Sequence, residues 1–236
     1  MRWESFDSSA ALSLRAATLL LDTTRKTPSA VLGLPTGRTP IGMYERIVRE
    51  CGQDYHCFTE VVTFNLDEYV GVEPEHPASY ASYMRTHLFD HVDIQLSNVH
   101  IPHGTATDLD LECRNYEEAI REARGIDLMF LGLGRNGHIG FNEPGTPFNA
   151  RTRVVELTES TRRANAAWFE DGNVPSHAIT MGIETILDSR RIILLAAGDG
   201  KSEAIERLRD GEISENFPAS ALRLHPDVLV LCAANS

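Results

Sequence analysis

Five short runs along the chain consist almost entirely of apolar residues, and four of them end in a polar loop that contains glycine. Runs this short and this apolar are typical of strands buried on both faces of a sheet. Segments with apolar residues at helical spacing separate the runs, so strands alternate with helices. The expected strands are AVLGL (30–34), EVVTFNL (60–66), IDLMFLGLG (126–134), RRIILLAAG (190–198) and DVLVLCA (227–233). The sequence therefore predicts an α/β protein with a mostly parallel central sheet.

The polar loops that follow the first four runs are the expected ligand site, because ligands of such sheets bind at the carboxyl ends of the strands. These loops read PTGRTP, NLDEYVG, GRNGHIGFNEPG and AAGDGK. No repeat or linker interrupts the pattern, so we expect a single domain over residues 1–236. The expected helices are 8–26, 41–50, 77–91, 108–124, 158–170 and 200–210.

Charge and composition argue against several classes of protein. A net charge of −12 without a basic cluster is unlike a nucleic-acid-binding surface. No stretch approaches the ~20 apolar residues of a membrane helix, and the start of the chain lacks the apolar centre of a signal peptide. The four cysteines show no paired spacing for a disulfide framework or zinc site. We therefore expect a cytoplasmic protein with no nucleic-acid or membrane partner.

The segment LGLGRNGHIGFNEPG, residues 131–145, contains five glycines, and Gly132, Gly134 and Gly137 have the spacing of a dinucleotide-binding loop. In such a loop the last glycine opens a helix, whereas Gly140, Pro144 and Gly145 would break a helix here. The dinucleotide interpretation is therefore disfavoured. A constrained loop carrying His138 and Glu143 is typical of a general acid and its orienting carboxylate, although both side chains could simply cap backbone groups.

Two other loops combine a strand end, glycine and a helix start, which is the arrangement of a phosphate cradle. In LPTGRTP, Thr39 is the expected N-cap, Pro40 the first helical residue, and Arg38 an additional cation. Lys201, one of only two lysines, lies at the start of a later helix. A lysine does not complement that end of the helix dipole, so a bound anion would explain it. An ordinary turn and a surface lysine are the alternatives.

Asp67 and Glu68 follow the apolar run EVVTFNL. A carboxylate held by a rigid sheet and partly removed from water suits proton abstraction next to a carbonyl or imine. We expect Glu68 to serve as a cap or an ion-pair partner instead. His87 and His91 lack the glutamate of a zinc-binding helix, so no metal site is predicted there.

Five motifs together resemble the glucosamine-6-phosphate deaminases, also called glucosamine-6-phosphate isomerases, in their short form. The motifs are LGLPTGRTP, VVTFNLDEYVG, HPASY, GLGRNGHIGFNEPG and GDGK, in the family's order and over nearly the whole chain. The resemblance implies a Rossmann-like three-layer α/β/α sandwich. It also implies conversion of glucosamine 6-phosphate and water to fructose 6-phosphate and ammonia, without metal or redox cofactor.

The resemblance assigns roles by motif position. It makes Asp67 the base that moves a proton from C2 to C1 of the open-chain sugar, and His138 the group that opens the ring. Glu143 would orient that histidine, with Asn136 assisting. The substrate phosphate would bind to the residues of the first loop and to the second lysine. These phosphate-binding residues are Thr36, Gly37, Arg38, Thr39 and Lys201.

Several positions depart from the family's pattern. Some members carry aspartate where this chain has Asn136, and an amide cannot relay a proton. A phosphate-binding arginine of longer relatives aligns near Ala167, leaving Arg162 and Arg163 as candidate substitutes. Of the basic groups in the allosteric pocket of hexameric relatives, only Arg153 is retained. We therefore expect a monomer or small homo-oligomer without that control. Segment 146–172 is rich in turn residues before its helix, so it is a possible lid over the sugar.

Two alternatives use the same kind of sheet. A 6-phosphogluconolactonase-like hydrolase would typically show DGHTASLFP and a DER strand end, which this chain lacks. A non-catalytic sugar-phosphate sensor of a transcription regulator is usually fused to a helix-turn-helix, which we do not expect before the first strand. Both alternatives are less favoured than the deaminase.

Overall fold

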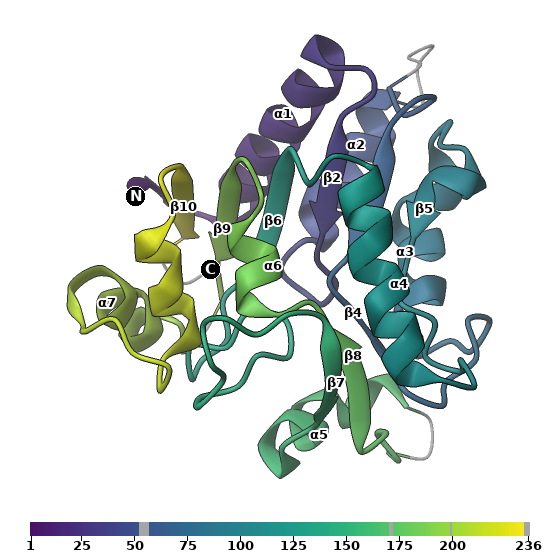
Figure 1. Ribbon diagram of the computed structural model, residues 1–236. Coiled ribbons are helices and arrows are strands. Elements are labelled where there is room, and N and C mark those ends of the chain that lie inside the picture. Colours follow the sequence, from purple (N-terminus) through teal and green to yellow (C-terminus); the bar gives the residue numbers. More distant parts are fainter. Residues whose placement is uncertain (52–56, 170–171, 199, 234–236) are drawn as a thin grey trace.

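The computed structural model describes residues 1–51, 57–169, 172–198 and 200–233, and its centre is a seven-stranded parallel sheet (Figure 1). The strand order is β1-β10-β9-β6-β2-β3-β5, and every pair of neighbours is parallel. The strands are β1 (Arg2–Phe6), β2 (Val31–Leu34), β3 (Val62–Asn65), β5 (Val99–His100), β6 (Leu128–Gly132), β9 (Ile192–Ala196) and β10 (Val228–Ala233). The predicted α/β class with a mostly parallel sheet is confirmed.

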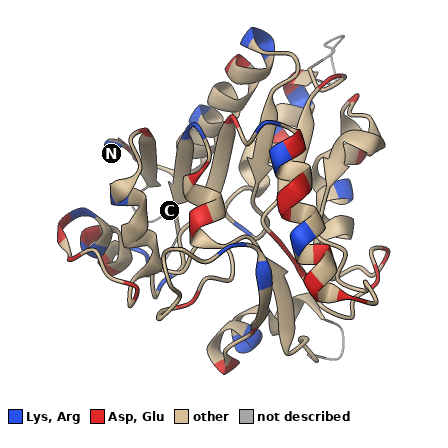
Figure 2. Cartoon of the chain, in the orientation of Figure 1, with Lys and Arg blue, Asp and Glu red and all other residues tan. Residues whose placement is uncertain are grey.

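Successive residues of the central strands point to opposite faces of the sheet and fill two separate apolar cores. In β9, for example, Ile193 and Leu195 join one core, whereas Ile192 and Leu194 join the other. The central strands β2, β6, β9 and β10 contain no Asp, Glu, Lys or Arg (Figure 2). Burial on both faces explains why the sequence shows continuous apolar runs there.

Helices cover both faces of the sheet and complete the three layers that the sequence predicts. α1 (Ser9–Lys26), α2 (Ile41–Cys51) and α3 (Tyr80–His87) contribute buried residues to the first core. α4 (Leu109–Glu122), α6 (Ile183–Leu187) and α7 (Ser202–Asp210) contribute buried residues to the second. Short 3₁₀ segments add η1 (Phe89–His91), η2 (Leu96–Asn98), η3 (Ala166–Trp168) and η4 (Pro218–Leu224). None of the described helices is long and apolar enough to cross a membrane.

A second, three-stranded antiparallel sheet was not expected from the sequence. It has the order β4-β8-β7 and consists of β4 (Asp67–Tyr69), β8 (His177–Thr180) and β7 (Arg153–Glu156). With α5 (Glu159–Asn165) it extends from one end of the main sheet (Figure 1). Asp67 and Glu68 thus belong to a separate strand that pairs with β8, rather than ending the preceding one.

Most predicted elements are present with shifted ends. The helices expected at 77–91 and 158–170 are shorter, because each gives way to a 3₁₀ turn, at η1 and η3. β1 was missed, and it pairs with β10 at the sheet edge. The four cysteines are buried and free. The single domain and the lid at 146–172 stay predictions, and residues 170–171 of that lid lie outside the described residues.

Candidate active site

Asp67 begins β4 and lies almost entirely in the interior, with 6% of its surface exposed. In the part of the chain that the structure describes, no hydrogen bond reaches its carboxylate. Burial, and secondarily the charge of Glu68, raise the pKa of Asp67 to about 8. Burial without hydrogen-bond donors destabilises the charged carboxylate, so Asp67 keeps its proton to a higher pH than an exposed aspartate does. Asp67 is therefore a carboxyl group that gains and releases a proton near neutral pH.

Glu68, its neighbour, is also buried but accepts three backbone hydrogen bonds. Tyr69 N and Tyr80 N donate to Oε1 at 2.8 and 3.0 Å, and Ala81 N donates to Oε2 at 2.9 Å. Two of these donors open α3, so the carboxylate occupies the positive end of that helix. The expectation that Glu68 is a cap is confirmed. Burial raises its pKa, and the three backbone bonds oppose that shift.

The loop that carries His138 passes directly over Asp67. A Cβ placed on Gly140 would lie 3.3 Å from Asp67 Oδ2 and 3.0 Å from Thr180 Oγ1. Gly140 also has φ +56, so this close approach requires glycine on two grounds. The structure therefore brings the loop that carries His138 and the strand that carries Asp67 to one place.

Gly134 makes room for the imidazole, because a Cβ there would lie 2.4 Å from His138 Nδ1. No helix follows Gly137, and residues 133–152 form turns and irregular chain. The glycines that mimic a dinucleotide-binding loop thus serve tight turns around a histidine. The rejection of the dinucleotide interpretation is supported by this geometry.

His138, Asn136 and Glu143 form a hydrogen-bonded chain. Asn136 Nδ2 donates to Glu143 Oε2 at 2.6 Å, and His138 Nδ1 lies 2.7 Å from Asn136 Oδ1. Because an amide oxygen only accepts, the assigned amide orientation places the proton of the neutral imidazole on Nδ1. Nε2 then carries the lone pair. Glu143 Oε1 lies 3.8 Å from His138 Nδ1, too far for a direct hydrogen bond.

The environment of His138 favours the neutral ring. Burial lowers the pKa of His138, the carboxylate of Glu143 opposes this change, and the ammonium of Lys201 adds to it. A neutral imidazole with one free nitrogen can accept a proton at one atom and return it to another. The site therefore holds a carboxyl group with a raised pKa and an imidazole with a lowered pKa, and both shifts favour the neutral form.

The expected phosphate loop lies at the carboxyl end of β2. Tyr83 donates its hydroxyl proton to Gly37 O at 2.6 Å, and Tyr44 donates to Pro35 O at 2.6 Å, so the loop is fixed on both sides. The helix begins at Ile41, the start expected from its apolar pattern, so Pro40 precedes the helix instead of being its first residue. Tyr44 N donates to Pro40 O, and the helix start lies at the loop, as a phosphate cradle requires.

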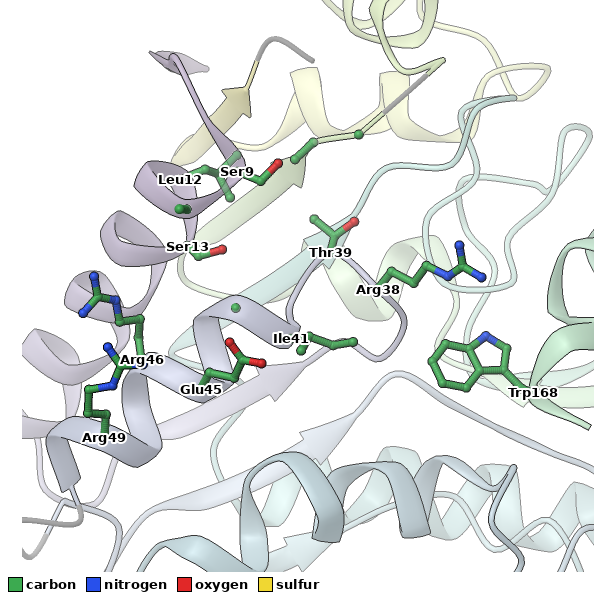
Figure 3. Close-up of a pocket in the computed structure, with 14 residues that line it drawn as sticks. Ser9, Leu12, Ser13, Arg38, Thr39, Ile41, Glu45, Arg46, Arg49 and Trp168 are labelled. Atoms are coloured by element: carbon green, nitrogen blue, oxygen red, sulfur yellow. The ribbon is translucent and has the colours of Figure 1, made fainter. Parts of the chain in front are cut away.

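A groove of about 670 Å³ opens beside this loop (Figure 3). Arg38 and Thr39 line it together with Gly198, from the loop after β9, and Trp168 of η3. Arg38 lies at the same end as Trp168, away from Arg46 and Arg49. The loops after β2 and β9 therefore face one space. Lys201, Asp67 and His138 do not line this groove, so it runs beside α1 and α2 and does not mark the sugar site.

Lys201 immediately precedes α7 and points back into the protein. Its ammonium donates to Leu133 O, in the loop after β6. Burial lowers the pKa of Lys201, and the charge of Arg135 adds to this effect. The lysine thus joins the loop after β9, to which it belongs, to the loop that carries His138. Its contact with a phosphate stays a prediction.

The two candidate substitute arginines are engaged elsewhere. Arg162 Nε donates to Val174 O at 3.1 Å, and Arg163 is exposed and lies 3.5 Å from Glu159. Arg153 Nη1 donates to Asn142 Oδ1 at 2.9 Å, which ties β7 to the loop that follows His138. Of these arginines, only Arg153 touches the loop that carries the candidate catalytic residues.

Sequence reasoning missed Thr161 and Tyr80. Thr161 Oγ1 donates to Glu143 Oε1 at 2.5 Å, and the hydroxyl of Tyr80 donates to the hydroxyl of Tyr69 at 3.2 Å. Each contact joins two separate elements, so no local pattern reveals it. In the sequence, Tyr80 was noted only as part of the family motif HPASY. Thr161 was noted only as part of the helix start at 158–161, which reads TEST.

Comparison with known proteins identifies one family. The family model described as glucosamine-6-phosphate isomerases/6-phosphogluconolactonase matches residues 5–230. A glucosamine-6-phosphate deaminase of Lysinibacillus sphaericus is 49% identical, over 98% of this chain and 98% of that protein. One of Bacillus velezensis is 52% identical, over 93% of this chain and 92% of that protein.

A solved structure of a monomeric glucosamine-6-phosphate deaminase superposes with a TM-score of 0.96 and 48% identity, covering 99% of this chain and 97% of that one. The 6-phosphogluconolactonase of Thermotoga maritima gives a TM-score of 0.76 at 18% identity, over 98% of each chain. At that identity the likeness concerns the fold alone.

Proposed function

This chain belongs to the family of glucosamine-6-phosphate isomerases and 6-phosphogluconolactonases, and we propose that it is a glucosamine-6-phosphate deaminase. It converts glucosamine 6-phosphate and water to fructose 6-phosphate and ammonia. Relatives of that name are 49–52% identical over nearly the whole chain. The observation that carries the proposal is the passage of the His138 loop over Asp67, at Gly140. The reaction moves one proton between two carbons and another between two oxygens of the same hexose, so it needs two proton-transfer groups in one place.

The first step is the opening of the sugar ring by His138. Nε2 accepts the proton of the anomeric hydroxyl and delivers a proton to the ring oxygen, while the bond between C1 and that oxygen breaks. The products are an aldehyde at C1 and a hydroxyl at C5. Asn136 and Glu143 hold the ring and its Nδ1 proton in place, so the free nitrogen faces the sugar.

Asp67 then carries the isomerisation. Its carboxylate removes the proton from C2 while a proton of the substrate's ammonium group passes to the C1 oxygen, giving an enolamine between C1 and C2. The same carboxyl group then returns the first proton to C1, which leaves a hydroxymethyl group at C1 and an iminium group at C2. Water adds to C2 and ammonia leaves, so the overall equation balances. A carboxyl group with its pKa raised to about 8 is a stronger base than an ordinary aspartate, which favours removal of a proton from carbon.

The phosphate anchors the sugar between the loop Thr36–Thr39 and Lys201. Backbone N–H groups at the start of α2 and the Arg38 guanidinium supply the local positive charge that a chain of net charge −12 needs for an anion. Lys201 adds a half-buried ammonium from the other side.

A lactone hydrolase is the second member of this family, and it is disfavoured here. Hydrolysis of a lactone needs no base for a C–H bond, so a buried, unbonded Asp67 beneath Gly140 would have no task. The 6-phosphogluconolactonase structures are 16–20% identical, so their likeness to this chain concerns the fold alone. A non-catalytic sugar-phosphate sensor would likewise have no use for the buried carboxyl group of Asp67.

We also propose that the protein acts as a monomer in the cytoplasm, without a metal or redox cofactor. A monomeric deaminase with a TM-score of 0.96 supports the monomeric state. Sedimentation tests it directly, and a hexamer would contradict it.

Ammonia release from glucosamine 6-phosphate tests the activity. We expect stoichiometric ammonia and fructose 6-phosphate in a buffer that contains EDTA and no nucleotide. 6-Phosphogluconolactone serves as the competing substrate in a parallel assay. Hydrolysis of the lactone without ammonia release from the amino sugar would overturn the proposal.

A further inference from the structure

The first turn of α5 presents a hydroxyl group to the catalytic loop. Thr158 is the N-cap of α5, and its Oγ1 accepts a hydrogen bond from Thr161 N at 3.2 Å. The same hydroxyl donates to Thr161 Oγ1 at 3.0 Å. Thr161 is buried, with 8% of its surface exposed. Its hydroxyl proton is therefore directed away from the helix.

That proton goes to Glu143. Thr161 Oγ1 donates to Glu143 Oε1 at 2.5 Å, whereas Asn136 Nδ2 donates to Glu143 Oε2 at 2.6 Å. Each oxygen of the carboxylate thus has its own donor, one from α5 and one from the loop that carries His138. Hydrogen bonds to an ionised acceptor are among the stronger ones in proteins. The two bonds together fix the orientation of the carboxylate.

The orientation decides which group touches the imidazole. Glu143 Oε1 lies 3.8 Å from His138 Nδ1, and Asn136 Oδ1 lies between the two residues at 2.7 Å from the same nitrogen. If Oε1 lost its donor, the nearest N–H in this network would be that of His138. Rotation toward it would replace the neutral amide by a carboxylate as the direct partner of the ring.

We propose that Thr161 is a positioning residue, which holds Glu143 away from His138 so that the amide of Asn136 remains the direct partner of the imidazole. The inference rests on the proposed function, in which His138 opens the sugar ring. Thr161 contacts neither the ring nor the sugar in this scheme and acts only through Glu143.

The charged groups that act on His138 are Glu143 and Lys201, and Arg135 acts on Lys201. Glu143 belongs to the same loop as the histidine, whereas Lys201 comes from the loop before α7. A closer approach of Glu143 would strengthen the favourable ion pair and raise the pKa of His138. Lys201 does not contact Glu143 or Thr161, so its contribution stays constant when Thr161 changes.

The test replaces the hydroxyl and follows the histidine directly. In Thr161→Val, which keeps the shape, NMR titration of His138 in the free protein should show its pKa raised by roughly half a unit or more. His138→Gln identifies the resonance. In the ammonia assay we expect kcat to fall about 3- to 10-fold while KM changes less than about twofold. Thr161→Ser restores the hydroxyl and should restore both values.

Ser160→Ala is the matched control, because Ser160 lies in the same turn and its hydroxyl bonds only to Thr158 Oγ1. It should leave the titration of His138 and kcat unchanged. If Thr161→Val does not fold, Thr161→Cys keeps a side chain of similar size with a much weaker donor and replaces it in both measurements. An unchanged titration of His138 in the folded variant would overturn the proposal.

The titration uses the protein without substrate, so it separates this inference from the proposed function. Absence of ammonia release from the wild type would refute the deaminase. A normal histidine titration in Thr161→Val would refute only the role of Thr161.

Discussion

Asp67 and His138 belong to two regions of the site that are built in different ways. Asp67 stands on a strand of the small sheet, is buried, and has no hydrogen-bond donor among the described residues. His138 stands on a glycine-containing loop, and its side chain is 33% exposed and bonded to Asn136. The carboxyl group is held by backbone pairing, whereas the imidazole is held by side-chain hydrogen bonds.

The difference shows how one fold prepares two proton-transfer groups. Burial raises the pKa of Asp67 to about 8 and lowers the pKa of His138, so both move toward a neutral group at pH 7. At the strand, the pKa of Asp67 stays raised because no hydrogen-bond donor among the described residues reaches its carboxylate. At the loop, Glu143 opposes the lowering of the His138 pKa, and Asn136 fixes the tautomer of the ring.

The largest expected effect is that of Asp67→Asn. An amide cannot take a proton from carbon, so exchange of the C2 hydrogen with tritiated water should fall about 10⁴-fold, the upper end of what a general base contributes. Binding of the sugar phosphate should change little, because Asp67 does not hold the phosphate. Exposed Asp90→Asn is the control. Preserved exchange in Asp67→Asn would remove Asp67 from this role.

The same variant should be more stable than the wild type at pH 8. The folded state holds the Asp67 proton more tightly than the unfolded chain, so the free energy of unfolding falls as pH rises from about 4 to about 8. Removing the group removes this loss, which is about 5 kcal/mol at most. Urea unfolding at pH 5 and pH 8 measures the difference between the two proteins.

His138→Gln tests the loop region and should have the next largest effect. Loss of a general acid and base lowers the rate about 10²- to 10⁴-fold, and here the loss concerns ring opening. An acyclic hexitol phosphate needs no ring opening, so it should inhibit the variant and the wild type with similar affinity. A large loss of that affinity would mean that the imidazole binds the sugar instead.

The sequence predicted the main sheet well because each central strand is buried on both faces and therefore appears as a continuous apolar run. The small sheet was missed for the opposite reason. Its strands are only three or four residues long, and β4 reads as a polar strand end, Asp67-Glu68-Tyr69. Pairing of β4 with β8, more than a hundred residues away, leaves no local pattern.

The part of the candidate site that the sequence predicted is the part whose polar residues lie in one short segment. The residues Asn136, His138 and Glu143 lie within one turn-rich loop, so their association could be expected from the sequence. Thr161 could not be expected, because its contact with Glu143 depends on how α5 packs against that loop. Arg162 and Arg163 were plausible by position alone, and their side chains point to other partners.

Lys201→Ala should have a smaller effect than either catalytic variant, and it should act on binding. A hydrogen bond to a charged group contributes about 1.5–3 kcal/mol, so KM should rise roughly 10- to 100-fold with kcat little changed. Exposed Lys26→Ala is the control, since Lys26 is the only other lysine and lies at the end of α1. Unchanged affinity in Lys201→Ala would exclude the lysine from the phosphate site.

The smallest expected effect on the rate, and the sharpest test of the strand region, is that of Glu68→Gln. The charge of Glu68 is the second cause of the raised pKa of Asp67, so its removal should lower that pKa while burial keeps it above the ordinary value. Because Asp67 must be ionised to act as a base, kcat/KM of the wild type should rise with pH up to about 8. In the variant this rise should occur at lower pH, by about one unit or less.

Glu68→Gln also replaces one accepting oxygen by a donor that faces a backbone N–H, at Tyr69, Tyr80 or Ala81. An opposed pair of buried donors costs about 1–3 kcal/mol, so urea unfolding should show a less stable protein. Lower stability with a shifted pH profile fits a neighbour that both caps α3 and tunes Asp67. Lower stability with an unshifted profile would mean that burial alone sets the pKa of Asp67, and that the two carboxyl groups of β4 are electrostatically independent.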